Sequence, residues 1–394
     1  MRYLGRNLPV RVISSLGSAR PLSLLFLSLI VLAVVACGSY FEGQILVVSD
    51  RDGDSEIFLL SPKNGEMSRL TNNESQDFSP HWSPDGKKII YLSNESGLLQ
   101  VNQMDLDEQT IRQMTYESSV EGPPLWSPDG QRFVFTADIE GNLEIFWMDT
   151  DGGEPTRVTD NALTERLGDW SPDGQWLVFY NDEPTEDIGL WLRNPDGVNL
   201  IRLTKGTDSQ PVFSPDGRRI AFVRAHQGNA DIYVLKRADD GTWRDPVESS
   251  RLTQEVEKDF YPVWSQDGKN VIFVTFRDGN GEVYLMRADG ARQQRLTNNT
   301  AQDGNPVWSP DGSFIAFVSF VYGKGEIFVM DADGGNVRQL TDLGGASFAP
   351  FWHPDGDRII FASSWHDPAG RNFDLFIINA DGTGLERVTF NGTF

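Results

Sequence analysis

Six carboxylates recur at one fixed spacing, each five residues before the aromatic residue of a repeated five-residue word. They are Asp77, Glu121, Glu165, Asp208, Asp259 and Asp303, and the seventh repeat has Ser347 at the same place. Carboxylates gathered at one site can bind divalent cations or the basic side chains of a partner. The alternative is structural, because a carboxylate at the start of a strand also accepts hydrogen bonds from local backbone N–H groups. The two interpretations are compatible with each other.

A second acidic pattern has alternating carboxylates at Asp50, Asp52, Asp54 and Glu56. Alternating carboxylates are typical of calcium-binding loops, so calcium is the one cofactor that the sequence suggests. The glycine of the pattern, Gly53, stands two places too early for such a loop, and Ser61 occupies the position of the closing glutamate. A polar hairpin tip is the simpler interpretation.

Motifs for catalysis are missing from the sequence. It contains neither a Gly-x-Ser-x-Gly nucleophile elbow nor a glycine loop that would hold a phosphate. The histidines are spread along the chain without the spacing of metal ligands, at His81, His226, His353 and His366. We interpret them as surface or packing residues. The sequence therefore predicts a protein that is not an enzyme.

A repeat positions the six carboxylates. Its word reads aromatic-Ser-Pro-Asp-Gly, with Gln266 in place of proline in one copy and His353 in place of serine in another. The copies start at Trp82, Trp126, Trp170, Phe213, Trp264, Trp308 and Trp352. Proline presets φ, aspartate bonds its own backbone and glycine takes the left-handed conformation, so the word predicts a tight turn between antiparallel strands. We expect the aromatic ring to wedge between neighbouring units.

Each unit has the same order of strands and turns. In the copy at Trp308, the apolar runs Phe314–Val318 and Ile327–Met330 follow the word, and a shorter strand ends at Leu340-Thr341. Nearly continuous apolar runs are typical of strands covered on both faces, and no helical period runs through the body. The Leu-Thr ending or a close variant occurs eight times. This pattern predicts an all-β fold of four-stranded units.

An arginine precedes each Leu-Thr ending by two or three residues, as Arg69, Arg157 and Arg295 do. Side chains alternate between the two sides of a strand, so we expect these arginines to point away from the body. We interpret them as solvated charges on the outer edge, where an ion pair contributes little.

Two places depart from the regular repeat. Gln44 to Thr71 supplies three strands without the word, and only five residues follow Thr389. Either Ser39 to Gly43 supplies the missing strand, or the first unit has three strands. The unit at Phe213 is lengthened by Asp239 to Glu248, between its third and fourth strands, which predicts a loop that protrudes from one rim.

Four-stranded units packed radially are the blades of a β-propeller. The pattern Pro-x-Trp-Ser-Pro-Asp-Gly, apolar strand, Asp-Gly turn, Arg-Leu-Thr resembles the WD-like repeats of the TolB propeller family from Gln44 to Thr389. The resemblance implies one propeller over residues 44–394, with eight blades and seven as the alternative. It also places the six carboxylates at one mouth of the central channel.

The resemblance leaves the function open, because the same repeats occur in Tol-system proteins, peptidase propeller domains and sugar-acid lyases. A peptidase would need a hydrolase domain after the propeller, and the sequence contains none. A lyase of the oligogalacturonate type would hold a metal with clustered histidines, which the sequence also lacks. The chain differs from TolB itself in having no separate domain before the propeller.

Residues 1–36 have the pattern of a secretory signal. Four arginines and no acidic residue precede the apolar run from Pro21 to Ala36, which is shorter than the roughly 20 residues of a membrane span. Val34-Val35-Ala36-Cys37 resembles the lipobox of bacterial lipoproteins, which implies cleavage before Cys37 and lipid attachment there. Cys37 is the sole cysteine and forms no internal disulfide. The alternatives are an unrelated thiol or an uncleaved anchor. Residues 37–43 would then be a short tether.

The chain is strongly acidic, and loss of the signal would lower its formal charge from −23 to −27. An acidic body does not bind nucleic acid through phosphates, and it favours a cationic partner. We therefore expect a monomeric, extracytoplasmic, lipid-anchored binding protein for a protein, a basic peptide or an envelope glycan. The alternatives are a propeller lyase and a structural spacer without a small ligand.

Overall fold

The computed structural model describes residues 40–41, 44–49, 54–61, 66–139, 141–161, 163–181, 188–194, 199–243, 249–366 and 374–388. The chain divides into Met1–Val35 and Ala36–Phe394, and all described residues belong to the second unit. Among them, no helix is long and apolar enough to cross a membrane. The secondary structure is almost entirely β-strand.

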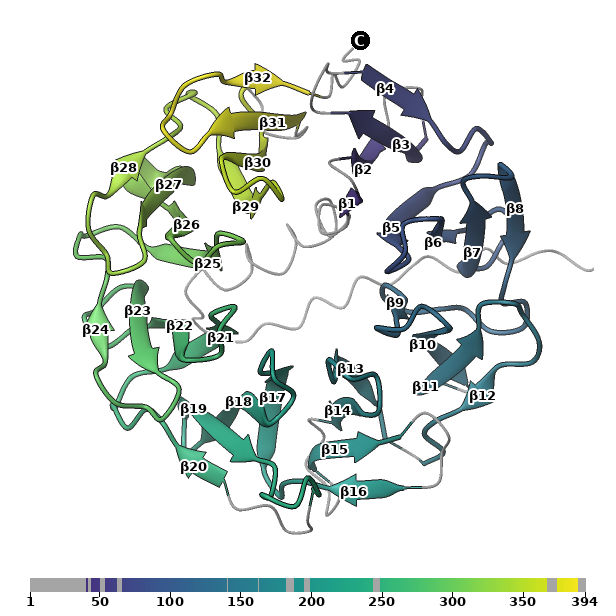
Figure 1. Cartoon of the computed structure of the whole chain (residues 1–394), viewed down its shortest axis with the longest axis horizontal. Helices are drawn as coiled ribbons and strands as arrows, with labels where there is room; N and C mark the ends of the chain where they lie inside the picture. The colour runs from purple at the N-terminus through teal and green to yellow at the C-terminus, as the bar shows by residue number, and fades with distance from the viewer. Residues whose placement is uncertain are drawn as a thin grey trace, which may run out of the picture. The chain divides into compact units, whose positions relative to one another are not determined.

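The strands form eight antiparallel sheets of four strands, and the sheets are the blades of one propeller (Figure 1). Each blade uses four consecutive strands, with the first nearest the centre of the ring and the last at its rim. Blades 1 and 2 comprise β1 (Tyr40–Phe41), β2 (Gln44–Ser49), β3 (Glu56–Ser61), β4 (Glu66–Arg69), β5 (Asp77–Trp82), β6 (Lys88–Ser93), β7 (Gln100–Asp105) and β8 (Thr110–Gln113).

The remaining blades repeat this order. Blades 3 to 5 comprise β9 (Leu125–Trp126), β10 (Arg132–Ile139), β11 (Asn142–Asp149), β12 (Thr156–Arg157), β13 (Arg166–Trp170), β14 (Leu177–Asn181), β15 (Gly189–Arg193), β16 (Leu200–Arg202), β17 (Thr207–Phe213), β18 (Arg219–His226), β19 (Asn229–Lys236) and β20 (Ser249–Arg251). Blades 6 to 8 comprise β21 (Asp259–Trp264), β22 (Asn270–Thr275), β23 (Glu282–Arg287), β24 (Gln294–Arg295), β25 (Asp303–Trp308), β26 (Phe314–Ser319), η2 (Val321–Gly323), β27 (Glu326–Asp331), β28 (Arg338–Gln339), β29 (Ser347–Trp352), β30 (Arg358–Ser363), β31 (Asp374–Asn379) and β32 (Glu386–Arg387).

The predicted count of eight blades is confirmed, and β1 supplies the strand that the repeat lacked. In the first blade Tyr40 pairs with Ile45 and Phe41 with Gln44, so this innermost strand comes from the segment predicted as a tether. Blades 1 and 8 lie side by side in the ring, and each uses strands from its own end of the chain (Figure 1). Among the described strands, none is exchanged between these two blades.

The five-residue word forms the predicted turn between the first two strands of its blade. In the copy at Trp82, the Gly86 N–H donates to the Ser83 carbonyl at 2.9 Å, and Gly86 takes a φ of 69°. The Ser83 hydroxyl donates to Asp85 Oδ1 at 2.6 Å and accepts from the Lys88 N–H at 2.9 Å. The side chains of the word therefore complete the hydrogen bonds of the turn.

The aromatic ring of the word wedges between blades, as expected. Trp126 Nε1 donates to the His81 carbonyl of the preceding blade at 3.0 Å, and Trp352 Nε1 donates to the Val307 carbonyl at 3.2 Å. Apolar side chains fill the space between blades, and one cluster joins Ile272 of blade 6 to Phe317 and Met330 of blade 7. The core is therefore a series of layers between neighbouring blades, covering both faces of each sheet.

A β-bulge interrupts most of the innermost strands. Ser79, Gln210, Tyr261, Asn305 and Ala349 have φ between 50° and 55°, each just before a proline and at a break in the pairing register. Proline has no N–H for the ladder, so a bulge is where it fits in a sheet. Recurrence in five blades shows that this left-handed residue is part of the blade's regular architecture.

The insertion after Lys236 does not simply protrude, which corrects the prediction. Its Trp243 is buried and packs edge-on against Phe213, with 6.2 Å between ring centroids. Phe213 is the smaller aromatic of the one word that lacks tryptophan, so Trp243 fills the remaining space between blades 4 and 5. Residues 244–248 of the insertion lie outside the described residues.

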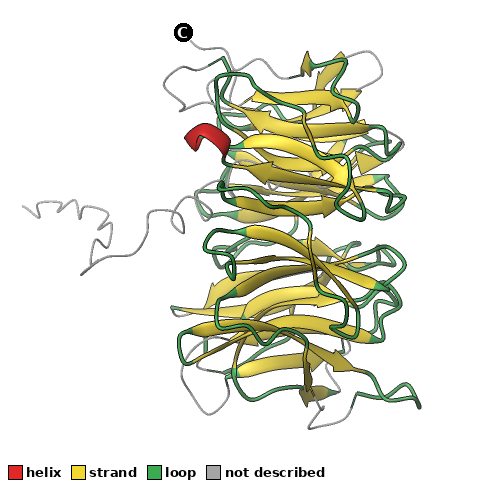
Figure 2. Cartoon of the chain, turned by 90° about the vertical axis from the view of Figure 1, so that its left-hand side faces the viewer, coloured by secondary structure: helices red, strands yellow, loops and turns green. Residues whose placement is uncertain are grey.

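The two faces of the ring carry different loops. The turn face holds the five-residue words and the turns between third and fourth strands. The link face holds the links between blades and the hairpins between second and third strands. Figure 2 shows the ring edge-on, with η2 projecting from the link face, since η2 connects β26 to β27. Every innermost strand begins at the link face. The six carboxylates predicted to bind a ligand therefore lie at this face, at or near the starts of these strands.

Candidate functional site: the link face and its blade joints

The predicted carboxylates lie at the joints between blades, where a link enters the next innermost strand. Asp77, Asp259 and Asp303 begin β5, β21 and β25, whereas Asp208 is the second residue of β17. Glu121 and Glu165 precede β9 and β13. Five of the six are buried, and Glu121 is exposed. Five of these side chains are therefore enclosed by protein, so their role in binding a cation or basic segment stays a prediction.

The joint between blades 1 and 2 shows how a buried carboxylate is accommodated. Asn73 of the link donates its side-chain N–H to Asp77 Oδ2 at 2.9 Å and its backbone N–H to Glu56 Oε1 at 2.8 Å. Arg69 Nη2 donates to the same Glu56 oxygen at 2.7 Å. The joint thus contains one arginine and two carboxylates, with an asparagine between the carboxylates.

The same arrangement recurs in the joints between blades 3 and 4 and between blades 6 and 7. In the latter, Arg295 Nη2 lies 2.9 Å from Glu282 Oε1, and Asn299 Nδ2 donates to Asp303 Oδ2 at 2.6 Å. In the former, Arg157, Glu144, Asn161 and Glu165 take the corresponding positions. The recurrence indicates that this network joins one blade to the next.

Two joints replace the asparagine by a second arginine. Arg224 of blade 5 binds Asp208 with two hydrogen bonds, at 2.6 Å from Nε and 2.8 Å from Nη2, and its guanidinium stacks over Tyr233. Arg277 Nη2 lies 3.4 Å from Asp259 Oδ1 and stacks over Tyr284. A bidentate pair fixes both partners in one geometry, so Asp208 is bound more firmly than the other carboxylates.

The arginines of the outer strands are not simply solvated charges, and that prediction is corrected. Arg69, Arg157, Arg251, Arg295 and Arg387 each reach inward to a buried carboxylate on the third strand of the same blade, at 2.5 to 2.9 Å. Their side chains keep 22 to 36% of their exposure, because only the guanidinium end is enclosed.

The third-strand carboxylates were missed at the level of sequence. They are Glu56, Glu144, Asp231, Glu282, Glu326 and Asp374, and all are buried. A signal was present, because each begins a triplet of acid, aliphatic and aromatic residue, such as Glu282-Val283-Tyr284. A buried charge is costly without a partner, so an acid that recurs before an apolar strand indicates a partner elsewhere in the repeat.

Burial alters the pKa of several joint carboxylates. Desolvation raises the pKa of Asp77, and the nearby Glu56 charge adds to this rise, although hydrogen bonds from Ser93, Asn73 and Thr71 oppose it. Desolvation raises the pKa of Asp303 to about 6, with the Glu282 charge again adding to the rise. Joints with two carboxylates and one arginine therefore hold excess negative charge at neutral pH.

No metal site is formed by the side chains that the structure describes. Among the described residues, no group of three or more His, Cys, Asp or Glu is arranged to hold a metal ion. Asp50 and Asp52 of the predicted calcium pattern lie outside the described residues. Of the other two, Asp54 is half-buried and Glu56 is held by Arg69 in the first joint. The calcium assignment stays a prediction.

The four histidines have separate surroundings. Burial lowers the pKa of His81 to about 4. His226 Nε2 lies 3.5 Å from Asp231 Oδ2, and His353 Nδ1 lies 2.8 Å from Asp355 Oδ2. The ring of His366 stacks on Trp365, with 4.5 Å between centroids. Each histidine thus has a local packing or pairing partner.

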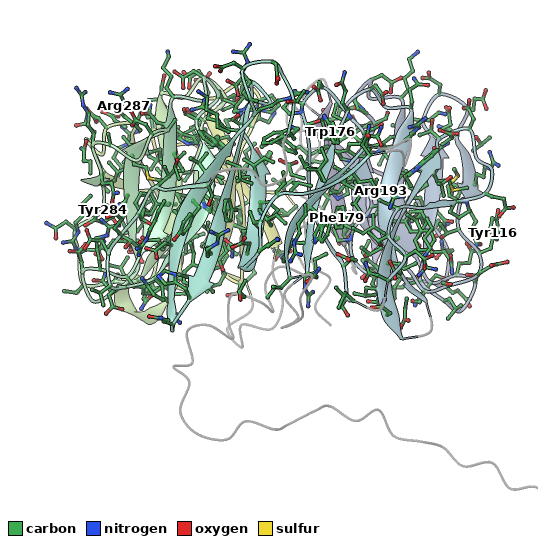
Figure 3. All side chains as sticks on the ribbon, turned by 90° about the horizontal axis from the view of Figure 1, so that it is seen from below. Tyr116, Trp176, Phe179, Arg193, Tyr284 and Arg287 are labelled. Carbon is green, nitrogen blue, oxygen red and sulfur yellow. The ribbon has the colours of Figure 1, made fainter. Side chains whose placement is uncertain are left out.

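An exposed acidic surface extends over the link face of blades 2 and 3, and we call it the acidic patch. Its parts are joined by backbone hydrogen bonds: Asn94 donates to Gln76, Val120 to Leu99 and Asp138 to Ser119, at 2.9 to 3.3 Å. Its exposed carboxylates are Glu74, Glu95, Glu117, Glu121 and Asp138. Two large apolar side chains stand among them, Leu98 at 46% exposure and Tyr116 at 67%. Figure 3 shows Tyr116 at the periphery of the ring.

In the described part of the chain, no ion pair involves a carboxylate of the acidic patch, and Arg69, Arg132 and Arg157 pair with carboxylates outside it. The lysines and arginines between residues 70 and 165 are Lys87, Lys88, Arg112, Arg132 and Arg157. The first two and Arg132 follow the words on the turn face, whereas Arg112 and Arg157 lie on outer strands. The other half of the link face differs, because Lys205, Lys258 and Lys324 stand among its acidic residues. The patch is therefore the more acidic part of this face.

Family comparison agrees with this architecture. The TolB beta propeller domain model matches residues 41–123 and 194–319, more than half of the chain. The chain belongs to the TolB beta propeller domain family. The model of the tricorn protease N-terminal beta propeller domain also matches, at residues 288–393.

Curated relatives of this TolB-family propeller are longer than the part they share with it. The TolB homolog of Chlorobium luteolum is 31% identical over 202 residues, which is 50% of this chain but 35% of that protein. The Tol-Pal system protein TolB of a Ruegeria species is 27% identical over 73 residues, 18% of this chain and 17% of the relative. The matched stretches thus span about a third or less of these relatives.

Solved structures share the fold of this TolB-family propeller at low sequence identity. The oligogalacturonate lyase of Vibrio parahaemolyticus has a TM-score of 0.57 and 17% identity, covering 76% of this chain and 89% of the lyase. Puromycin hydrolase has a TM-score of 0.56 and 13% identity, covering 81% of this chain and 54% of the hydrolase. At these identities the likeness concerns the fold alone.

Proposed function

We propose that this propeller is a non-catalytic, extracytoplasmic binding scaffold, anchored to a membrane through a lipid on Cys37, that holds a protein partner on its link face. The observation that carries this proposal is the acidic patch, in which exposed apolar side chains stand among carboxylates that form no ion pair with the described residues. Apolar groups ringed by charge are typical of protein interaction sites. Five buried third-strand carboxylates at the joints, by contrast, are already paired with an outer-strand arginine.

The chemistry of the patch favours a partner with a basic segment that carries apolar side chains. Its carboxylates attract lysine and arginine at long range, and the attraction weakens with salt over a Debye length of about 8 Å at physiological ionic strength. Leu98 and Tyr116 offer apolar contact once the segment has arrived. The names of the Tol-Pal relatives agree with a partner that is a protein.

A peptide titration tests the chemistry of the patch. We expect a short fluorescent peptide of alternating lysine and leucine pairs to bind the mature protein, and the triple substitution Glu95→Gln, Glu117→Gln and Asp138→Asn to weaken binding about fivefold or more. Fluorescence anisotropy at low and moderate salt measures this. A peptide with serine in place of leucine should bind more weakly. Equal affinity of the two peptides would exclude the apolar contact.

A matched control separates the patch from the overall charge of the protein. Glu108→Gln, Asp151→Asn and Glu154→Gln remove the same charge from exposed residues on the turn side of the same blades. We expect this variant to bind the lysine-leucine peptide within about twofold of the wild type. If the two triple variants lose affinity equally, the patch is not the binding site.

Capture of the natural partner tests the proposed function itself. Wild type and both triple variants are cross-linked in cells, and the attached proteins are identified by mass spectrometry. We expect a protein that the wild type and the turn-face variant retain and the patch variant loses. If no protein is attached to the wild type, the scaffold function is contradicted, whatever the peptide result.

The anchor is tested separately. We expect Cys37→Ser to abolish lipid labelling and to release the propeller from the membrane fraction, because lipid attachment requires the thiol. Metabolic labelling with a lipid precursor and cell fractionation measure both effects. A mutant that remains labelled and membrane-bound would contradict the lipoprotein assignment.

A further inference from the structure

We propose that the joint between blades 7 and 8 is a pH-dependent latch, which Glu326 keeps closed when its carboxyl group is protonated and loosens when it is ionised. The geometry of the repeats sets this joint apart. In blades 1, 3, 5, 6 and 8 the third-strand carboxylate is held by an outer-strand arginine at 2.5 to 2.9 Å. Glu326 is the equivalent residue of blade 7.

In blade 7 the arginine is displaced by one residue. Gln339 pairs with Phe328 in the register where blades 1, 3, 4, 5, 6 and 8 have the arginine, and its side-chain amide donates to the Thr341 carbonyl at 2.6 Å. Arg338 points to blade 8 instead and donates to the Ala380 carbonyl at 3.0 Å. Among the described residues, no arginine therefore holds Glu326 as one holds its equivalents.

Glu326 is 4% exposed, and the described residues around it hold little positive charge. The Thr341 hydroxyl donates to Oε2 of Glu326, and in the sheet register Ser319 of β26 lies opposite Glu326. The charged groups around it are Lys324, Asp342 and, across Ser319 on β25, Asp303. The Lys324 ammonium donates to the Gly344 carbonyl of the link. On blade 8 the Ser347 N–H donates to the carbonyl of Gly325, next to Glu326, and the described side chains there, Ser347 and Ser363, are neutral and bonded to each other.

Burial raises the pKa of Glu326 to about 7, and Asp342 adds to this rise while Thr341 and Lys324 oppose it. A carboxyl group whose pKa is raised in the folded state stabilises that state fully at pH values below its pKa in the unfolded chain. This contribution is lost as pH rises through about 7. The link after Thr341 is held to blade 7 by the Ser347 N–H, which donates to the Gly325 carbonyl at 2.6 Å. Opening of this link would let water reach the ionised Glu326.

Hydrogen exchange of the full mature protein tests the latch. Correcting for intrinsic exchange, we expect the protection of amides 341–347 to fall about tenfold between pH 6 and pH 8. The joint between blades 3 and 4, where Arg157 holds Glu144, should keep its protection over the same range. Equal protection of the wild-type link at both pH values would overturn the proposal.

Two substitutions distinguish the latch from a general effect of pH. Glu326→Gln removes the titrating group, and Gln339→Arg supplies the cation that blades 1, 3, 5, 6 and 8 have. Each should abolish the difference between pH 6 and pH 8 in amides 341–347. The second variant provides the test if the first does not fold. A pH dependence that survives in a folded variant would show that Glu326 is not its cause.

Discussion

Arg295→Met is expected to lower the free energy of unfolding by about 3 kcal/mol at pH 7. The reason is that Glu282, fully buried, would keep its carboxylate but lose Arg295, which lies 2.9 Å from its Oε1, while the nearby Asp303 at 3% exposure adds a second negative charge. Removing one member of a buried ion pair typically costs about 3–5 kcal/mol, and the 29% exposure of Arg295 places the expectation at the lower end. Methionine keeps most of the aliphatic packing, so the loss reports on the charge. Urea unfolding measures it.

Two further variants isolate the joint. Arg287→Met removes an arginine of the same blade whose pair with Asp289 is more than half exposed on both sides, and it should cost less than about 0.5 kcal/mol. Adding Glu282→Gln to Arg295→Met should restore most of the loss, because the unpaired charge is then gone. If Arg287→Met and Arg295→Met destabilise the protein equally, the joint network does not hold the blades together.

The architecture could be predicted because it is encoded locally and repeatedly. Ser83, Asp85 and Gly86 form the turn through bonds within the word itself, so one copy predicts its geometry and seven copies predict the ring. Counting strands showed that the first blade was one strand short and gave Ser39 to Gly43 as one of two solutions, and Tyr40–Phe41 of that segment forms the strand. The burial of Trp243 could not be predicted in this way. Trp243 fills space that the smaller ring of Phe213 leaves, and the two residues, distant in the sequence, meet only in the folded protein.

The joints escaped prediction because their parts are separated in the sequence. Arg69 and Glu56 are 13 residues apart and meet only when β3 pairs with β4. The alternation of side chains along the outer strand correctly places the arginine Cβ away from the core. The arginine side chain is nevertheless long enough for its guanidinium to reach back to a buried carboxylate oxygen. Carboxylates such as Asp77 were found by their spacing, but spacing does not reveal that Asn73 and the neighbouring blade enclose them.

The acidic patch illustrates a third limit. Glu95, Tyr116 and Asp138 belong to a hairpin, a link and another hairpin, and no periodic signal connects them. They form one surface because β-propeller topology returns every second turn to the same face, and the hydrogen bonds around Val120 join their loops. Net charge predicted a cationic partner, whereas locating its site required the fold.

Asp303→Asn and Asp208→Asn are expected to change stability in opposite directions, although the two aspartates hold equivalent places in the repeat. Asp303 is buried without an arginine of its own, and desolvation raises its pKa to about 6. Its carboxyl group stabilises the fold below the unfolded pKa of 3.8, and that contribution is lost as pH rises through 6. Asparagine removes the charge, so Asp303→Asn should stabilise the protein by up to about 3 kcal/mol at pH 8 and by little at pH 4.

Asp208 has the opposite balance, because it accepts two hydrogen bonds from Arg224, whose side chain is 22% exposed. Asp208→Asn leaves that guanidinium partly buried without a counter-charge and should cost about 3 kcal/mol at pH 8. Urea unfolding of both single variants at pH 4, 6 and 8 measures the two effects.

A triple substitution of Asp77, Asp208 and Asp303 would combine stabilising and destabilising effects. A ligand-binding role of these residues is therefore better tested on Asp303→Asn, which should keep the fold. If both single variants shift stability in the same direction at pH 8, local pairing does not determine the energetics of the joints.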